Sequence, residues 1–257
     1  MHRRMDSNDA RDTGKEAAAD SGTLTFLHMQ VTEPGTLPRG QHDLPPEYVA
    51  DHQRKRIQDA TTHVLAERGY SAATIGDIVA RAHVSRRTFY DHFESKEHCV
   101  LATFGAATEC IASAVQTAYR GEEEWDAAIA AGLSELVRVL IEYPHVACTC
   151  FLEVRALGSA AADQTAAVRG MCIDALRTGA AARPGAEPAS DMAFEMGLGG
   201  LLTVIRARLA AHELESLAAE LPDIARALLE PLAGRVAAEA VAERVVVASD
   251  GRSAHAI

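Results

Sequence analysis

The sequence predicts an all-α protein with two helical domains, and three observations lead to this class. Apolar residues recur at the i, i+3, i+4, i+7 spacing of packed helices, and strand-like alternation is limited to a marginal stretch at 245–247. Of the 257 residues, 48% are hydrophobic but only 5% are aromatic. Ser and Thr caps and Gly or Pro stops divide the periodic segments into separate helices.

Composition divides the chain into four segments. Residues 1–44 are polar, aperiodic and rich in Gly, Pro, Asp and Ser, so we expect a disordered arm. Its Arg3 and Arg4 suit either a minor-groove contact or an inert tail. We expect a three-helix domain over 45–95, a larger helical domain over 96–240 and a flexible tail over 241–257.

The first predicted helix follows Pro45-Pro46 and ends near Arg68, where Gly69 supplies the stop. The second begins at the N-cap Thr74, which forms a capping-box-like pair with Asp77. The first helix is long enough to support the shorter helices that follow, which completes the three-helix domain.

The next helix restarts at a second N-cap, Ser85, after a turn of about three residues. Val84 and Phe89 are spaced as a hydrophobic staple, which fixes the entry angle of this helix. Phe89 and Phe93 form its inner face. The outer face carries basic, aromatic and acidic side chains, namely Arg86, Arg87, Tyr90 and Asp91. This arrangement is the physical description of a DNA-reading helix-turn-helix.

Further helices complete the larger domain. Ser95 caps a helix from Lys96 to about Arg120, which should join the two domains. Helices are then predicted over 125–143, 145–157, 162–182, 190–211 and 222–240. Gly197 and Gly200 lie inside the helix predicted over 190–211, where glycine costs helix stability and so suggests a close helix–helix approach.

The stretch from about Arg54 to Leu101 resembles the N-terminal domain of TetR-type (tetracycline-repressor-like) transcriptional regulators. The resemblance rests on caps, core positions and contact positions in a fixed order: Gly69-Tyr70, Thr74, Ile78, Val84-Ser85, Phe89-Tyr90, His92-Phe93 and Lys96-Glu97. It implies that the phosphate backbone is held by Thr74, Ser85, Tyr90, His92 and Lys96. It also implies that bases are read by Arg86, Arg87 and Thr88. His92 suits a core position equally well.

By the same resemblance, the larger domain encloses an effector and forms a four-helix bundle with a second subunit. The candidate pocket residues are Phe104, Trp125, Cys148, Phe151, Met171 and Met196. The candidate interface residues are Gly197, Gly200, Leu201, Ile205, Leu228 and Leu232. Large apolar residues at helical spacing are also what a simple core requires.

The net charge of −11 is unusual for a DNA-binding protein, but it is unevenly distributed. Between Asp51 and His98 there are eight Lys/Arg and seven Asp/Glu, so this segment is +1 and the remainder is −12. The acidity therefore belongs to parts of the chain that should face away from DNA. A weakly basic reading domain implies dependence on correct base contacts.

Signals for catalysis and redox chemistry are weak. His145 and Cys148 lie three residues apart on a short apolar helix, which is a common packing arrangement, and Cys148 and Cys150 face different sides of it. Five cysteines without metal-ligand spacing are expected to be reduced core residues. No window of 18 unbroken apolar residues and no secretory h-region are present, so we expect no membrane partner and a cytoplasmic location.

These observations favour a sequence-specific transcriptional regulator without enzymatic activity, cofactor or metal. We expect a homodimeric repressor that leaves its palindromic operator when a small lipophilic or aromatic effector binds. Two alternatives stay open. One is a redox or electrophile sensor that acts through Cys148, Cys150 or Cys172, and the other is a helical small-molecule-binding protein or enzyme with a vestigial helix-turn-helix.

Overall fold

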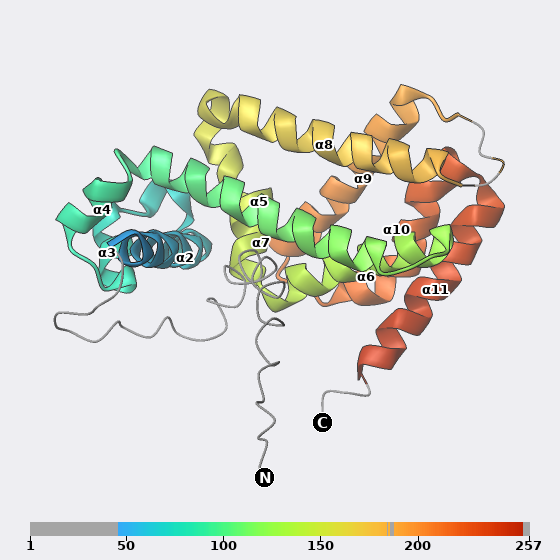
Figure 1. Ribbon diagram of the computed structural model, residues 1–257, viewed down its shortest axis with the longest axis horizontal. Coiled ribbons are helices and arrows are strands. Elements are labelled where there is room, and N and C mark those ends of the chain that lie inside the picture. Colours follow the sequence, from blue (N-terminus) through green and yellow to red (C-terminus); the bar gives the residue numbers. More distant parts are fainter. Residues whose placement is uncertain (1–45, 184, 186–187, 254–257) are drawn as a thin grey trace, which may run out of the picture.

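The computed structural model describes residues 46–183, 185 and 188–253, with side chains as far as Val245. Every regular element in this part of the chain is helical, as the sequence predicts (Figure 1). The three-helix domain lies at one end of the molecule and the last helices lie at the other. The predicted N-terminal arm over 1–44 lies outside the described residues.

The small domain has the three predicted helices, α2 (Pro46–Ala72), α3 (Ile75–Ala82) and α4 (Arg86–His92). Gly69 breaks the regular path of α2 with a φ of +72°, a conformation that glycine adopts without strain. Thr74 and Asp77 form the complete capping box of α3. The Ser85 side chain caps α4 by accepting from the backbone N–H of Thr88.

The long helix α5 (Lys96–Arg120) runs from the small domain toward the far end of the molecule (Figure 1). It is followed by α6 (Trp125–Glu142) and the short α7 (Pro144–Phe151). The single helix predicted over 145–157 is wrong, because α7 ends at Phe151 and a 3-10 helix, η1, covers Glu153–Ala161. Within η1, Gly158 has a φ of +56°, which interrupts a regular helix at this point.

The C-terminal part contains α8 (Ala162–Ala181), α9 (Asp191–Ala210), α10 (Ser216–Ala233) and α11 (Arg235–Ser253). The predicted helix over 222–240 is wrong at both ends: Pro222 lies inside α10, and Gly234, with a φ of +83°, separates α10 from α11. The flexible tail predicted from residue 241 is also wrong where side chains are described, because Val241, Ala242 and Val245 are completely buried.

Two clusters of buried apolar residues hold these helices together. The first joins Ile57 and Phe89 of the small domain to Phe104 of α5 and Val146 of α7. The second is built from α6, Ala147 of α7 and the helices α8 to α11. Phe151 packs against both clusters. The small domain therefore shares its core with the beginning of the larger domain, and a movement within that core affects both.

Helix α5 is long and apolar enough, by length and composition alone, to cross a membrane. Its residues Cys99, Val100 and Ala107 are fully buried within the first cluster. A core helix of this kind passes the same test, and α5 packs as such a helix here.

Candidate nucleic-acid interface

The helix-turn-helix is formed by α3, a short turn and α4. His83 ends α3 in the left-handed conformation, with a φ of +51°, and its N–H donates to carbonyls of the last turn of α3. The buried guanidinium of Arg56 in α2 donates to the carbonyl of Ala82 at 2.5 Å, which fixes the turn to the long helix behind it. Arg56 thus adds a positive charge to the domain, but its side chain stabilises the turn of the helix-turn-helix.

The outward face of α4 presents side chains that the resemblance assigns to DNA contacts, with Arg86 and Arg87 for bases and Tyr90 for phosphate. Arg86, Arg87 and Tyr90 are exposed, whereas Phe89 on the opposite face is fully buried. The guanidinium of Arg86 extends toward the N-terminus of α3, where it would lie 3.3 Å from a Cβ placed on Gly76. Exposed arginines on a short helix that is anchored from behind can form bidentate hydrogen bonds with guanine O6 and N7.

Two hydroxyl groups lie at the start of the reading helix. The Ser85 and Thr88 hydroxyls are 2.9 Å apart and hydrogen-bonded, and Ser85 also accepts from the Thr88 N–H. The capped N-terminus of α4, which is the positive end of the helix dipole, faces solvent. Asp91 is exposed on the same helix and forms no ion pair with Arg87 within the described residues.

Lys96 has a structural role that the sequence did not predict. Its Nζ donates to the carbonyls of Tyr70, at 2.7 Å, and Ala73, at 2.9 Å, and lies 4.2 Å from the centroid of the Tyr70 ring. Carbonyls at a helix end lack partners within the helix, and the ammonium group supplies them. One N–H of Lys96 is left for a phosphate, so that contact stays a prediction.

His92 is half-buried at the contact between α4 and α2. Its Nε2 lies 3.3 Å from Oε1 of Gln53, and its backbone carbonyl lies 3.5 Å from the Arg54 guanidinium. Burial lowers the pKa of His92, and Arg54 lowers it further. The ring is therefore neutral near pH 7, which favours the packing role over an ionic phosphate contact.

Glu153 of η1 joins the larger domain to this interface, and sequence reasoning missed it. Its carboxylate accepts from the backbone N–H of Tyr70 at 2.6 Å. Tyr70 also supplies the carbonyl and the ring that hold Lys96. No spacing in the sequence indicates this contact, because the two residues are 83 positions apart.

The predicted effector residues are not brought together. Phe104 belongs to the first buried cluster, while Trp125 packs against the second and donates its indole N–H to the carbonyl of Gly179. Met171 and Met196 are 47% and 70% exposed on the surface of the protomer, and their role as pocket residues stays a prediction. They lie on the outward faces of α8 and α9, because the inward faces are occupied by residues such as Ile173 and Phe194. Cys148 and Phe151, both partly buried on α7, remain candidates.

The predicted dimer residues divide in a similar way. Ile205, Leu228 and Leu232 are at most 4% exposed inside the protomer, so they are not available to a second subunit. They belong to the second buried cluster, in which residues of α9, α10 and α11 pack together. Gly197 allows a close approach within the chain, since a Cβ there would lie 3.0 Å from Cδ1 of Leu228. Only Gly200 is exposed, with nothing within 4 Å of its Cβ position, while Leu201 is half-buried.

The cysteines are poorly suited to nucleophilic or redox chemistry. Burial and, to a smaller extent, the nearby Glu153 raise the pKa of Cys148 to about 11. Burial also raises the pKa of Cys150 to about 12 and raises that of Cys172. A thiol with a raised pKa holds little of the reactive thiolate at pH 7.

Comparison with known proteins identifies the class of this domain. Residues 57–103 match the family "Bacterial regulatory proteins, tetR family". A 44-residue segment is 48% identical to the transcriptional repressor DhaR of Mycobacterium sp. (strain GP1), over 17% of this chain and 22% of that protein. A 70-residue segment is 36% identical to the transcriptional activator FasR of Mycolicibacterium smegmatis, over 27% of this chain and 32% of that protein. The chain thus matches less than a third of the length of either relative.

Solved structures extend the likeness to the rest of the fold. The regulator TylP of Streptomyces fradiae, a TetR regulator, superposes with a TM-score of 0.58 at 23% identity, over 79% of this chain and 98% of that one. FadR of Bacillus subtilis, in complex with stearoyl-CoA, superposes with a TM-score of 0.57 at 19% identity, over 70% and 97%. The match to this family therefore covers residues 57–103, and the likeness over the rest of the chain is a likeness of fold.

Proposed function

We propose that this protein is a homodimeric, ligand-responsive transcriptional regulator that represses from a palindromic operator in the cytoplasm. The observation that carries the proposal is the capped helix-turn-helix, which presents Arg86, Arg87 and Tyr90 on the exposed face of α4. One short reading helix covers only a few base pairs, so two subunits are needed for a specific site.

The experiment is selection of bound duplexes from a random DNA pool by the full-length protein. The expected result is one enriched inverted repeat, and its two halves should be separated by about one helical turn or a multiple of it. A pool without an enriched motif contradicts the proposal. Arg226→Ala is the control variant. It also removes an arginine, but this arginine lies on α10 and pairs with Glu239 and Asp223.

The dimer interface in this proposal is the outward face of α8 and α9. Met192 and Met196 of α9 are 65% and 70% exposed, and Gly200 follows at the same four-residue spacing. Met171 of α8 is also exposed. An exposed face of methionines and small residues on two neighbouring helices suits association with a second copy.

The effector in this proposal is lipophilic or aromatic and enters near α7, where Phe151 packs against both buried clusters. Stearoyl-CoA, which the Bacillus subtilis FadR binds, is the first compound to test. Trp125, the only tryptophan, offers a fluorescence signal for its entry. Unchanged fluorescence and unchanged operator affinity across a series of acyl and aromatic ligands would contradict this class of effector.

Coupling between the two sites would use two connections, the rigid helix α5 and the hydrogen bond from Tyr70 to Glu153. An effector releases DNA only if it binds the DNA-incompetent state more tightly, and DNA must then weaken effector binding by the same factor. Glu153→Gln should reduce this coupling factor and leave effector affinity for the free protein unchanged. A coupling factor that is unchanged in Glu153→Gln would contradict the role of this hydrogen bond.

A further inference from the structure

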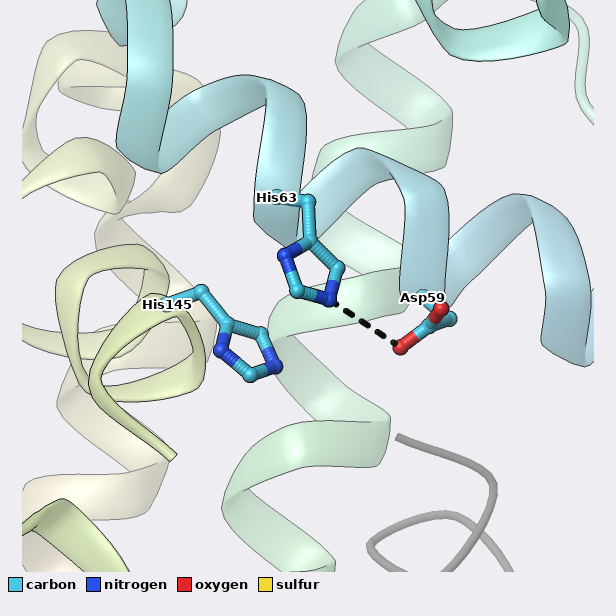
Figure 2. Close-up of side chains that lie close together, drawn as sticks. All are labelled: Asp59, His63 and His145. Carbon is cyan, nitrogen blue, oxygen red and sulfur yellow. Dashed lines mark ion pairs between the residues drawn. The ribbon is translucent and has the colours of Figure 1, made fainter. Parts of the chain in front are cut away.

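Three side chains that the sequence analysis did not connect meet between the small domain and α7. Asp59 and His63 lie on α2, one helical turn apart, and His145 lies in the first turn of α7 (Figure 2). One potential ligand atom from each side chain lies within 4.8 Å of the other two. We propose that Asp59, His63 and His145 bind a divalent transition-metal ion, with zinc as the first candidate.

The donor set suits such an ion. Two imidazole nitrogens and one carboxylate oxygen are typical ligands of zinc, and an open site keeps a fourth position for water. The i, i+4 spacing of Asp59 and His63 places both ligands on one side of α2. The third ligand, His145, comes from a separate helix, so the site would connect two parts of the fold.

The Asp59 carboxylate provides a second, independent observation. The residue is only 9% exposed, and its Oδ1 accepts no hydrogen bond within the described part of the chain. Nε2 of His63 lies 3.9 Å from this oxygen, beyond hydrogen-bond distance. A buried carboxylate oxygen without a hydrogen-bond donor is costly, and a bound cation would remove that cost.

Charge around the site is compatible with a cation. Arg81 acts electrostatically on all three side chains, but its guanidinium is paired with Glu67 at 2.6 Å. With neutral histidines, the surroundings therefore keep one net negative charge, that of Asp59. Burial lowers the pKa of His145 to about 3 and lowers that of His63, so both rings are neutral near pH 7, as metal ligation requires.

The metal-bound geometry requires small movements of side chains. The rings of His63 and His145 are stacked, with centroids 3.9 Å apart and planes 13° from parallel. Ligand atoms around a tetrahedral zinc lie about 3.3 Å apart. One ring must therefore rotate out of the stack, and the distance from His63 to Asp59 must shorten by about 0.6 Å. An ion bound this way would connect α2 directly to α7.

The test uses the full-length protein after chelator treatment, with Co²⁺ as a spectroscopic probe and Zn²⁺ as its competitor. We expect one Co²⁺ per chain, with visible absorption bands that Zn²⁺ abolishes. Asp59→Asn, His63→Gln and His145→Phe should each lower the affinity at least about 100-fold, since loss of mere supporting residues already costs 10–100-fold. His212→Asn is the control, because His212 is exposed and has a φ of +59° that asparagine tolerates.

Thermal unfolding by circular dichroism accompanies each titration. Zn²⁺ should raise the melting temperature of the wild type and of His212→Asn, but not of the three ligand variants. Asp59→Asn guards against misfolding as the cause, because it removes a buried charge and should fold at least as well as the wild type without metal. Absence of binding, equal affinity in Asp59→Asn, or an intense thiolate-to-cobalt charge-transfer band would each overturn the proposal.

Discussion

The two ends of the molecule hold their helices by different means. At the DNA-binding end, α3, α4 and α5 each begin with a side-chain cap, at Thr74, Ser85 and Ser95. At the opposite end, α10 begins without such a cap but buries Leu217, Leu221 and other residues along its length. Helices of seven or eight residues are unstable alone, so local hydrogen bonds matter most there, whereas α10 depends on its neighbours.

The difference has a functional reading. Short, capped helices can present one polar face to a ligand while a few aromatic side chains anchor the other face. Long helices packed on several sides have less free surface, and α10 exposes only one face, with residues such as Asp223 and Ala227. Among the described residues of the larger domain, the exposed large apolar side chains are Met171 on α8, Met192 and Met196 on α9, and Val236 on α11.

The largest expected effects come from removing a fully buried anchor at either end. Phe89→Ala should cost about 3–5 kcal/mol of unfolding free energy, and Leu217→Ala about 2–5 kcal/mol. Only Phe89→Ala should also abolish operator binding under conditions where the protein stays folded, because Phe89 holds α4. Denaturant unfolding and DNA binding are measured for both variants. Loss of DNA binding by folded Leu217→Ala would contradict the comparison.

The next effect concerns the exposed face of α9. Met196→Lys places a charge in the proposed subunit interface. We expect the dissociation constant of the dimer to rise, and the affinity for the operator to fall, at least about tenfold. Val236→Lys is the matched control, because Val236 is 84% exposed on α11. Sedimentation velocity measures both variants. A wild type that is monomeric at micromolar concentration would refute the dimer itself.

Two glycines of one helix provide a smaller and more precise contrast. Gly200→Ala should stabilise each protomer by about 1 kcal/mol, since its Cβ position is open and alanine favours helix. Gly197→Ala should lose most of this gain, because its Cβ would lie 3.0 Å from Leu228. Gly200→Leu should instead weaken the dimer. Thermal unfolding at low protein concentration separates these effects, and equal shifts for the two alanine variants would be inconsistent with this packing.

The last prediction is that the cysteines of the folded protein are modified slowly. A rise in the pKa of Cys148 from 9 to about 11 lowers its thiolate fraction at pH 8 about 100-fold. Alkylation of the folded protein should therefore be slow at pH 8 and accelerate about tenfold per pH unit toward pH 11. Rapid modification at pH 7 together with loss of operator binding would favour the thiol-sensor alternative.

The sequence predicted the DNA-binding end well because its signals are local. Thr74 with Asp77, and Val84 with Phe89, act over three to five residues, and the structure confirms both helix starts. The errors lie where distant segments decide the outcome. Leu228 of α10 packs against Gly197 of α9, and His145 meets His63 across 82 positions of sequence, so neither contact leaves a pattern within one helix. Only the spacing of Asp59 and His63 gave a hint of their shared face.

The central claim is that the exposed arginines of α4 read bases, and position-by-position binding to the selected operator tests it most directly. Every single-base variant of the operator would be measured against wild type, Arg86→Ala and Arg87→Ala. We predict that each alanine variant loses about 1–3 kcal/mol of discrimination at one symmetric pair of positions and keeps its preferences elsewhere. A uniform loss of affinity with all base preferences unchanged, as removal of a phosphate contact produces, would contradict the claim.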